Sequence, residues 1–236
     1  SNDHRMAMAA ILLGAVSIVG CKKSADSVDF EPQCSCPHAT IVLQPYDDFT
    51  QKEALKLKGD LEKHIDYILY GGFTVKVAAN KHLSDEFLGI SNTKYRADKI
   101  IGSLQDRAKQ DSIILGVTHK DICVAKKNGH TDWRVLGLSS SSKHACVVST
   151  HRIKHKSRDL WKVAMHEFIH TFYNYPHCPK DSIHCIMKDA KGHPDFSNKA
   201  NLCGYCRDRI GLGHRLVKCK KGELIQRIRD FIQRRV

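Results

Sequence analysis

One short stretch of the chain holds residues whose types and spacing could bind a metal ion and hydrolyse a bond: His166-Glu167-Phe-Ile-His170. On a helix, histidines four residues apart lie on one face a turn apart, so both imidazoles can reach one metal ion. This geometry is typical of zinc sites. Glu167 is positioned to accept a proton from a water molecule whose pKa zinc lowers to about 7. The stretch therefore predicts a zinc site with Glu167 as the general base.

A third histidine, His177, follows a predicted turn over 173–176 and completes a candidate set of three zinc ligands. The alternative is a surface helix that carries two solvated histidines. The flanking residues argue against it, because they form an apolar face opposite the histidines, as a helix with a buried site requires. These residues are Leu160, Trp161, Ala164, Met165, Phe168, Ile169 and Phe172.

Four cysteines follow the histidines: Cys178, Cys185, Cys203 and Cys206. Two separated pairs of thiolates suit a tetrahedral structural zinc that stabilises a lobe with little regular secondary structure. The same cysteines could instead form two disulfide bridges, because an exported protein lies where disulfides form. Their spacing alone leaves both alternatives open.

The elements that must position these residues alternate along the chain. Strands are predicted over 40–45, 73–79 and 112–118, and the last of these, apolar on both faces, is expected to be central. Between them lie two predicted helices, one over 51–70 that begins with a capping box, Thr50 to Glu53, and one that begins near 92 or 93.

Two further strands, over 133–138 and 145–150, flank the serine run 139–142 and lead into the histidine helix. Strands alternating with helices predict an α/β fold, a twisted mixed sheet backed by helices with the histidine helix beneath it. We expect an N-terminal catalytic lobe over 39–173 and a smaller, cysteine-rich C-terminal lobe over 174–236. In the latter, helices are predicted over 199–210 and 224–234, the second docked on the core with a solvated basic face.

The N-terminal residues predict where the protein is located in the cell. An apolar run over 6–20 is too short to span a bilayer comfortably, and Ile18-Val-Gly-Cys21 resembles a bacterial lipobox. We therefore expect a signal peptide over 1–20, lipidation of Cys21, a tether over 21–38 and a place in the bacterial cell envelope. The alternative is an uncleaved anchor or merely a hydrophobic start.

The composition is that of an ordinary globular protein, with 42% hydrophobic and 27% charged residues among 236. The exceptional quantity is the formal net charge of +13, which suggests an acidic partner, a membrane surface or nucleic acid. Nucleic acid is not the expected partner, because the chain has no nucleic-acid-binding motif such as zinc-finger spacing.

The site residues together resemble the archaemetzincin family of zinc metallopeptidases. The resemblance rests on His166-Glu-x-x-His170, a third histidine directly followed by a cysteine, then Cys185-Ile-Met187 and Cys203-x-x-Cys206. The run 113–118 followed by Asp121, and the run 147–150 followed by Arg152, resemble the family's strands that lead to the catalytic helix. The resemblance covers about 40–211.

The resemblance implies a role for each matching residue. His166, His170 and His177 would bind a catalytic zinc, and Met187 would form the Met-turn beneath it. The four cysteines 178, 185, 203 and 206 would bind a second, structural zinc, so two zinc ions are expected. It also implies a metzincin-like fold, with a cleft between the two lobes, and a peptidase that acts on short peptides or N-termini.

The chain departs from the family pattern where the histidine helix ends. The general metzincin motif has a glycine three residues after the second histidine, and the third histidine comes three residues later. Here Tyr173 occupies the glycine position and His177 lies one residue further along. Tyrosine is a poor residue for a left-handed helix end, whereas asparagine tolerates it. We therefore expect the helix to end around Asn174, with Pro176 stiffening the return to His177.

Two functions follow as hypotheses. The first is a monomeric zinc peptidase acting on a peptide or protein substrate, in which the strand near 133–138 holds the peptide extended. The second is a catalytically weak or inactive, zinc-stabilised basic module that binds an anionic partner, as the net charge suggests.

Overall fold

The structure, a computed structural model, describes residues 38–211 except Gly71, Gln110, Lys127, Ser182 and 192–194. The predicted signal peptide, Cys21 and the helix over 224–234 lie outside these residues. In the described part, no helix is both long and apolar enough to cross a membrane. The elements before the histidine helix are β1 (His38–Pro45), α1 (Gln51–Leu69), β2 (Gly72–Val77), the 3-10 helix η1 (Asp85–Phe87), β3 (Tyr95–Arg96), α2 (Ala97–Gln105), β4 (Ser112–Thr118), β5 (Ile122–Val124), β6 (Trp133–Val135), β7 (Gly137–Ser140) and β8 (Ala145–Ser149). The histidine helix α3 (Lys156–Tyr173) and the short α4 (Gly204–Arg209) follow.

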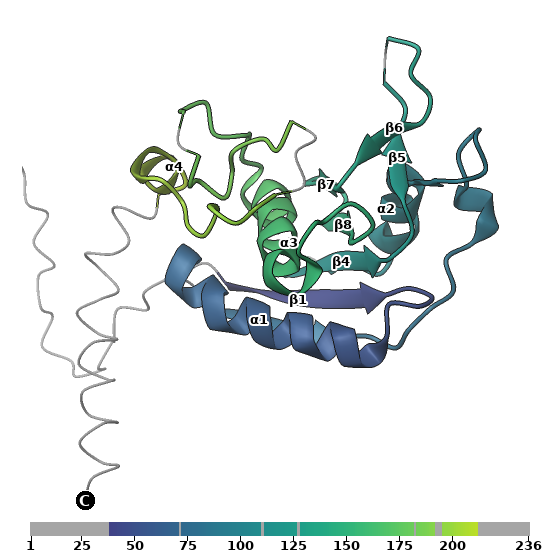
Figure 1. Cartoon of the computed structure of the whole chain (residues 1–236). Coiled ribbons are helices and arrows are strands. Elements are labelled where there is room, and N and C mark those ends of the chain that lie inside the picture. Colours follow the sequence, from purple (N-terminus) through teal and green to yellow (C-terminus); the bar gives the residue numbers. More distant parts are fainter. Residues whose placement is uncertain are drawn as a thin grey trace, which may run out of the picture. The chain divides into compact units, whose positions relative to one another are not determined.

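The main sheet has five strands in the order β2-β1-β4-β8-β7 (Figure 1). The first four are parallel, and β7 pairs antiparallel with β8 at the edge. The chain steps outward from β1 to β2 and then back across to β4, so right-handed crossovers require α1 and α2 on opposite faces. The expected mixed α/β sheet backed by helices is confirmed.

Two buried clusters show how the helices cover the sheet. Side chains of α1 and α3 pack with Ile113, Leu115 and Val117 of β4, whereas those of α2 pack with the alternate residue Ile114. Both faces of β4 are therefore buried, and β4 is the middle strand, as its two-sided apolar pattern predicts. The capping box of α1 also forms, with Glu53 N–H donating to Thr50 Oγ1 at 3.2 Å and Thr50 N–H donating to Glu53 at 2.8 Å.

Two expected elements before α3 differ in the structure. The second helix begins at Ala97 rather than near 92, because Asn92 has a positive φ of 50° and Tyr95–Arg96 pair with β5 as a strand. The strand expected over 133–138 is two strands divided at Leu136, and β6 joins a separate small sheet with β3 and β5. Pairing between distant segments overrides local propensity at both places.

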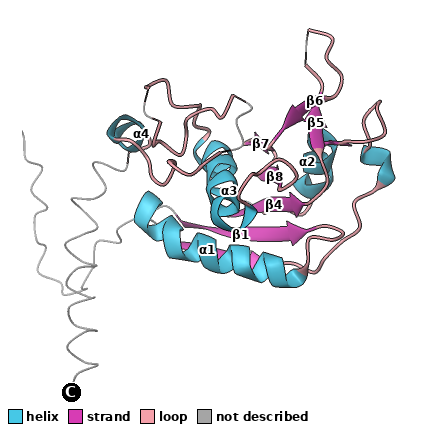
Figure 2. Ribbon diagram, in the orientation of Figure 1, coloured by secondary structure: helices cyan, strands magenta, loops and turns pink. Residues whose placement is uncertain are grey.

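The segment after α3 is mostly loop until α4 (Figure 2). Helix is confirmed only over Gly204–Arg209 of the expected 199–210, because Asn201 pairs with Cys185 in an isolated bridge. Cys178, Cys185, Met187 and Cys206 belong to the same buried cluster as Phe168 of α3. The segment that carries the cysteines thus packs directly on the histidine helix, and the division into lobes at residue 174 stays a prediction.

Candidate metal centres and cleft

Helix α3 separates its buried and functional faces as the sequence predicts. Trp161, Ala164, Met165, Phe168 and Ile169 are buried in the core, and both histidines of the motif line a cavity on the other side. The helix ends at Tyr173, and Asn174 adopts the left-handed conformation with φ 47° and ψ 42°. The predicted end of the helix is confirmed, and the chain is free to turn back there.

The three predicted histidine ligands converge. His166 Nε2 lies 3.0 Å from His170 Nε2 and 3.2 Å from His177 Nε2. In a tetrahedral site with Zn–N bonds of about 2.0–2.1 Å, ligand nitrogens lie about 3.3 Å apart. The three nitrogens therefore fit one zinc ion, and the extra residue between His170 and His177 does not prevent the third ligand from reaching the site.

Hydrogen bonds on the far side of the imidazoles orient them. His166 Nδ1–H donates to the Ile186 carbonyl at 2.7 Å, and His170 Nδ1–H donates to the Tyr175 carbonyl. These bonds leave each Nε2 as the free ligand atom, as second-sphere partners of zinc histidines do. Burial, and then the neighbouring His170, lower the pKa of His166 to about 3. Burial likewise lowers the pKa of His170, so both imidazoles are in the neutral form that binds metal.

Glu167 lies between the histidines and the edge strand β7. The residue is only 7% exposed, and burial raises the pKa of its carboxyl to about 8 although a hydrogen bond from Ser139 opposes the shift. A neighbouring cation favours the carboxylate form, so a metal on the histidines would make Glu167 a base. A Cβ atom at Gly137 would lie 2.6 Å from Glu167 Cγ and Oε1, so the absence of a side chain at 137 gives the carboxyl its place.

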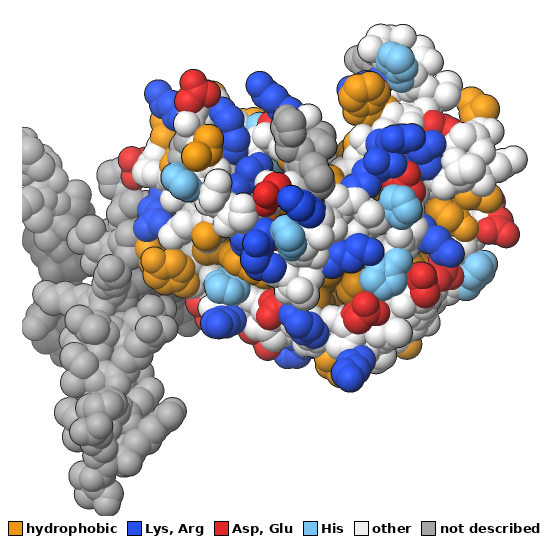
Figure 3. Space-filling model, in the orientation of Figure 1, with side chains coloured by type: hydrophobic (Ala, Val, Ile, Leu, Met, Phe, Trp, Pro, Cys, Tyr) orange, Lys and Arg blue, Asp and Glu red, His pale blue; other side chains and the backbone are white. Residues whose placement is uncertain are grey.

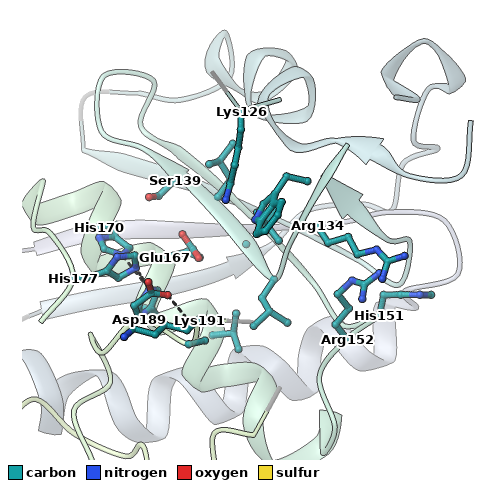
Figure 4. A pocket seen from close by; sticks show the side chains of 18 of the residues that line it. Lys126, Arg134, Ser139, His151, Arg152, Glu167, His170, His177, Asp189 and Lys191 are labelled. Carbon is teal, nitrogen blue, oxygen red and sulfur yellow. Dashed lines mark hydrogen bonds between the residues drawn. The ribbon is translucent and has the colours of Figure 1, made fainter. Parts of the chain in front are cut away.

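These groups line a cavity of about 1220 Å³. Figure 4 shows His170, His177 and Glu167 together at one end, with Asp189 and Lys191 beside them. One wall is the continuous segment 133–139, which includes β6 and the start of β7. The cavity therefore runs along a sheet edge, where an extended peptide could pair with β7.

The four cysteines form a second candidate metal centre. Cys178 Sγ lies 3.7 Å from Cys203 Sγ, and Cys185 Sγ lies 3.7 Å from Cys206 Sγ. All four sulfur atoms lie within 4.8 Å of one another. Tetrahedral zinc with Zn–S bonds of about 2.3 Å separates sulfurs by about 3.8 Å, whereas a disulfide bond is about 2.05 Å long. All four are free thiols, and their arrangement fits one tetrahedral zinc ion rather than two disulfides.

The two centres share a connecting segment. Tyr175 accepts from His170 through its carbonyl, and its hydroxyl hydrogen bonds with the Cys206 sulfur. Cys178 N–H donates to the Met187 carbonyl at 2.8 Å, next to the Ile186 carbonyl that orients His166. The cysteine centre thus holds the loop that carries His177.

The structure places Met187 in the buried core; its role as a Met-turn remains a prediction. Several cleft residues have no motif in the sequence, notably Gly137, Ser139 and Asp189. The Asp189 pKa is lowered, first by the hydrogen bond from Lys191 N–H and also by nearby His177 and His166. Only the tertiary approach of β7 and of the loop after Met187 brings these residues to the histidines, so the spacing of residues in the chain could not reveal them.

Comparisons with known proteins agree with this fold. The sequence matches no family model and no curated protein. Its structure is similar to archaemetzincin from Methanopyrus kandleri, with a TM-score of 0.61 and 21% identity over 76% of this chain and 96% of that one. It is also similar to archaemetzincin from Archaeoglobus fulgidus complexed with malonate, with a TM-score of 0.53 and 22% identity over 72% of this chain and 99% of that one. The chain therefore has an archaemetzincin-like fold, and its described residues include two groups that could each hold a metal ion.

Proposed function

We propose that the chain is a zinc-dependent metallopeptidase that hydrolyses peptide bonds of short peptides or of N-termini. The observation that carries this proposal is the convergence of three histidine Nε2 atoms beside buried Glu167 in a large cavity. The fold shared with archaemetzincins supports it.

Zinc on His166, His170 and His177 would act as a Lewis acid on the scissile carbonyl and lower the pKa of a water molecule. Glu167 then accepts the proton of the attacking water and returns it to the leaving amine. The hydrogen bond from Ser139 holds the carboxyl in place. The outer edge of β7 pairs with the substrate backbone and holds it extended along the cavity.

A second zinc ion on the four cysteines would be structural. It would leave no open coordination position, as closed tetrahedral sites do. Its part is to fix the loop over 174–178 and thereby the position of His177.

The Glu167→Gln variant tests the mechanism. We expect peptidase activity to fall by about 10²- to 10⁴-fold, while the zinc content per chain, measured by mass spectrometry, stays unchanged. Glu62→Gln is the matched control, because Glu62 pairs with Lys58 on the surface of α1. Full activity in Glu167→Gln would contradict the proposed role of this residue.

The competing proposal is a basic binding module without catalysis, which the net charge of +13 favours. Figure 3 shows Lys and Arg side chains spread over one face of the described part and interspersed with acidic ones. Binding of duplex DNA that weakens steeply with salt, in a chain that cleaves no peptide, would favour this alternative.

We also propose that Cys21 is lipidated and holds the protein in the bacterial cell envelope. The lipobox-like Ile18-Val-Gly-Cys21 supports this. Incorporation of labelled fatty acid into the native chain but not into Cys21→Ser tests it, and equal labelling of the two would contradict it.

A further inference from the structure

Three basic side chains gather at the end of the cavity away from the zinc ligands. Arg134 comes from β6, and His151 and Arg152 come from the loop after β8. Figure 4 shows these side chains close together and apart from His170 and His177. The segments that carry them are distant in sequence, so only the fold creates the cluster.

Arg152 is held rigidly. Its Nε and Nη2 donate to the two carboxylate oxygens of Asp121 at 2.9 and 2.7 Å, and Asp121 is 10% exposed against 30% for Arg152. A guanidinium group has five N–H donors in a planar fork, and a bidentate pair of this kind uses only one of its sides. The Nη1 side of Arg152 remains available to a second acceptor.

The positive charge of Arg134 is not paired with an acidic side chain in the described part of the chain. Its side chain is exposed, and no hydrogen bond or ion pair joins it to another residue in the described part of the chain. The nearest acidic residue in sequence, Asp132, instead accepts from Ser91 N–H at 2.7 Å. Of the two guanidinium groups only Arg152 is therefore paired with a carboxylate, that of Asp121, and the cluster has an excess of positive charge beside His151.

The spacing along the cavity wall relates this cluster to the reaction centre. Gly137 lies directly against Glu167, and Arg134 is three residues before it. Three extended residues span at most about 10 Å. A peptide that pairs with this wall in extended form covers the same span with about three residues of its own.

We propose that Arg134 and Arg152, with His151 beside them, form a subsite that binds a substrate carboxylate about three residues from the scissile bond. The carboxylate is either the side chain of Asp or Glu or the C-terminus of a short peptide. Arg134 supplies the unpaired charge, and Arg152 supplies a donor whose position is already fixed. The subsite rests on the proposed peptidase function and gives it a substrate class.

Binding without turnover tests the subsite independently of catalysis. The full chain with Glu167→Gln is titrated by calorimetry with a neutral hexapeptide amide, with the same peptide as a free acid, and with versions that carry Glu at each position. We expect one acidic version to bind about tenfold more tightly than the neutral amide, since hydrogen bonds to charged groups contribute on this scale. The peptide version that gains affinity shows whether the bound carboxylate is a Glu side chain or the C-terminus.

Two further variants locate the effect. Adding Arg134→Gln should reduce the gain to below about twofold, and Arg134→Lys should restore only part of it because the fork is lost. Adding Lys191→Gln removes the same charge from the histidine end of the cavity and should leave the gain intact. A gain that Lys191→Gln abolishes equally would overturn a local subsite in favour of a general positive field. Equal affinity for all peptides would also overturn it.

Cleavage by the native chain separates this proposal from the proposed function. If the tightest peptide binds in an Arg134-dependent way but is never cleaved, the subsite stands and the peptidase proposal fails. If acidic and neutral peptides are cleaved with the same KM, and Arg134→Gln changes neither KM nor kcat, the peptidase proposal stands and the subsite fails.

Discussion

The carboxyl of Glu167 occupies space that any side chain at position 137 would fill. A Cβ atom there would meet three atoms of Glu167 at 2.6–2.8 Å, closer than real Cβ atoms approach their neighbours. Gly137 lies in the edge strand β7. Glycine weakens a strand, and it often marks a position where another group approaches the backbone closely. Here the close group is the proposed general base.

Gly137→Ala should therefore displace Glu167. We expect at least about a 10²-fold loss of peptidase activity, because a misplacement of about 1 Å in a reacting group costs on this scale. Zinc content, measured by mass spectrometry, should stay unchanged because the histidines are not touched.

The control is Gly59→Ala, in the middle of α1 with nothing within 4 Å of an added Cβ. It should leave activity unchanged and stabilise the fold by about 0.5–1 kcal/mol. Equal activity of the two variants would show that Gly137 has no role in positioning the base.

The residues of the site differ in whether their role can be inferred from nearby positions in the sequence. His166, Glu167 and His170 could be predicted because a helix places them by spacing alone. The four cysteines could be singled out because they follow the histidines as two separated pairs, although their spacing did not decide between a zinc site and two disulfides. Gly137 and Arg134 could not, because their roles depend on where a distant strand lies relative to α3.

The end of α3 decides where the third histidine goes. Asn174 has a left-handed conformation, and its side-chain oxygen accepts from Ser141 Oγ at 2.9 Å. Non-glycine residues other than Asn and Asp seldom adopt this conformation, at a cost of about 1–2 kcal/mol.

Asn174→Val should lower the free energy of unfolding by at least about 1–2 kcal/mol and weaken zinc binding at the histidines, because the return to His177 starts at this residue. Asn174→Gly keeps the conformation accessible and should lose only the Ser141 hydrogen bond, about 1 kcal/mol. Denaturant unfolding and zinc titration measure the two effects, and similar losses in both variants would exclude a conformational role for Asn174.

The start of α3 carries a buried carboxylate. Asp159 is fully buried; burial alone would raise its pKa, but hydrogen bonds from Arg158 and Lys162 outweigh this effect and lower the pKa. Because the pKa in the folded state is below the unfolded value of about 3.9, Asp159 contributes stability above that pH. The contribution disappears as the pH falls through the folded value.

Asp159→Asn should thus lower the free energy of unfolding by about 2–4 kcal/mol at pH 7. The difference from the native chain should shrink as the pH falls below about 4. Asp60→Asn, which removes an exposed pair with Lys56, should cost less than about 1 kcal/mol. A pH-independent difference between Asp159→Asn and the native chain, measured by denaturant unfolding, would contradict the ion-pair account.

Among the elements, those with long periodic patterns were predictable and those made by pairing were not. The helix α1 shows its buried stripe in sequence, from Ala54 to Ile68, and the structure confirms it. Strands β3 and β5 have two and three residues. Segments this short show no hydrophobic periodicity in the sequence, and they become strands only because they pair with neighbouring segments.

At the scale of the whole molecule, chelators of increasing strength should remove the two proposed zinc ions one after the other. A weak chelator should remove the histidine-held ion first, because tetrathiolate sites bind zinc with about 10–16 kcal/mol and contribute that energy to folding. Activity should disappear while far-UV circular dichroism stays native.

A strong chelator should then remove the second ion and lower the melting temperature. Two zinc ions per chain before treatment, and one after the weak chelator, are the expected counts by mass spectrometry. Loss of structure at the first step, or a native melting temperature after removal of both ions, would contradict the division into catalytic and structural sites.

The adjacency of His177 and Cys178 joins the two centres through a single peptide bond. A ligand that is already in place costs less conformational entropy to use, so occupancy of the cysteines should increase the zinc affinity of the histidines. By the same linkage, oxidation of the thiols should loosen His177 and favour release of the histidine-held zinc without altering any histidine. The redox state of the surroundings would then regulate the affinity for the proposed catalytic metal, a dependence absent from a metallopeptidase whose third ligand stands apart from its cysteines.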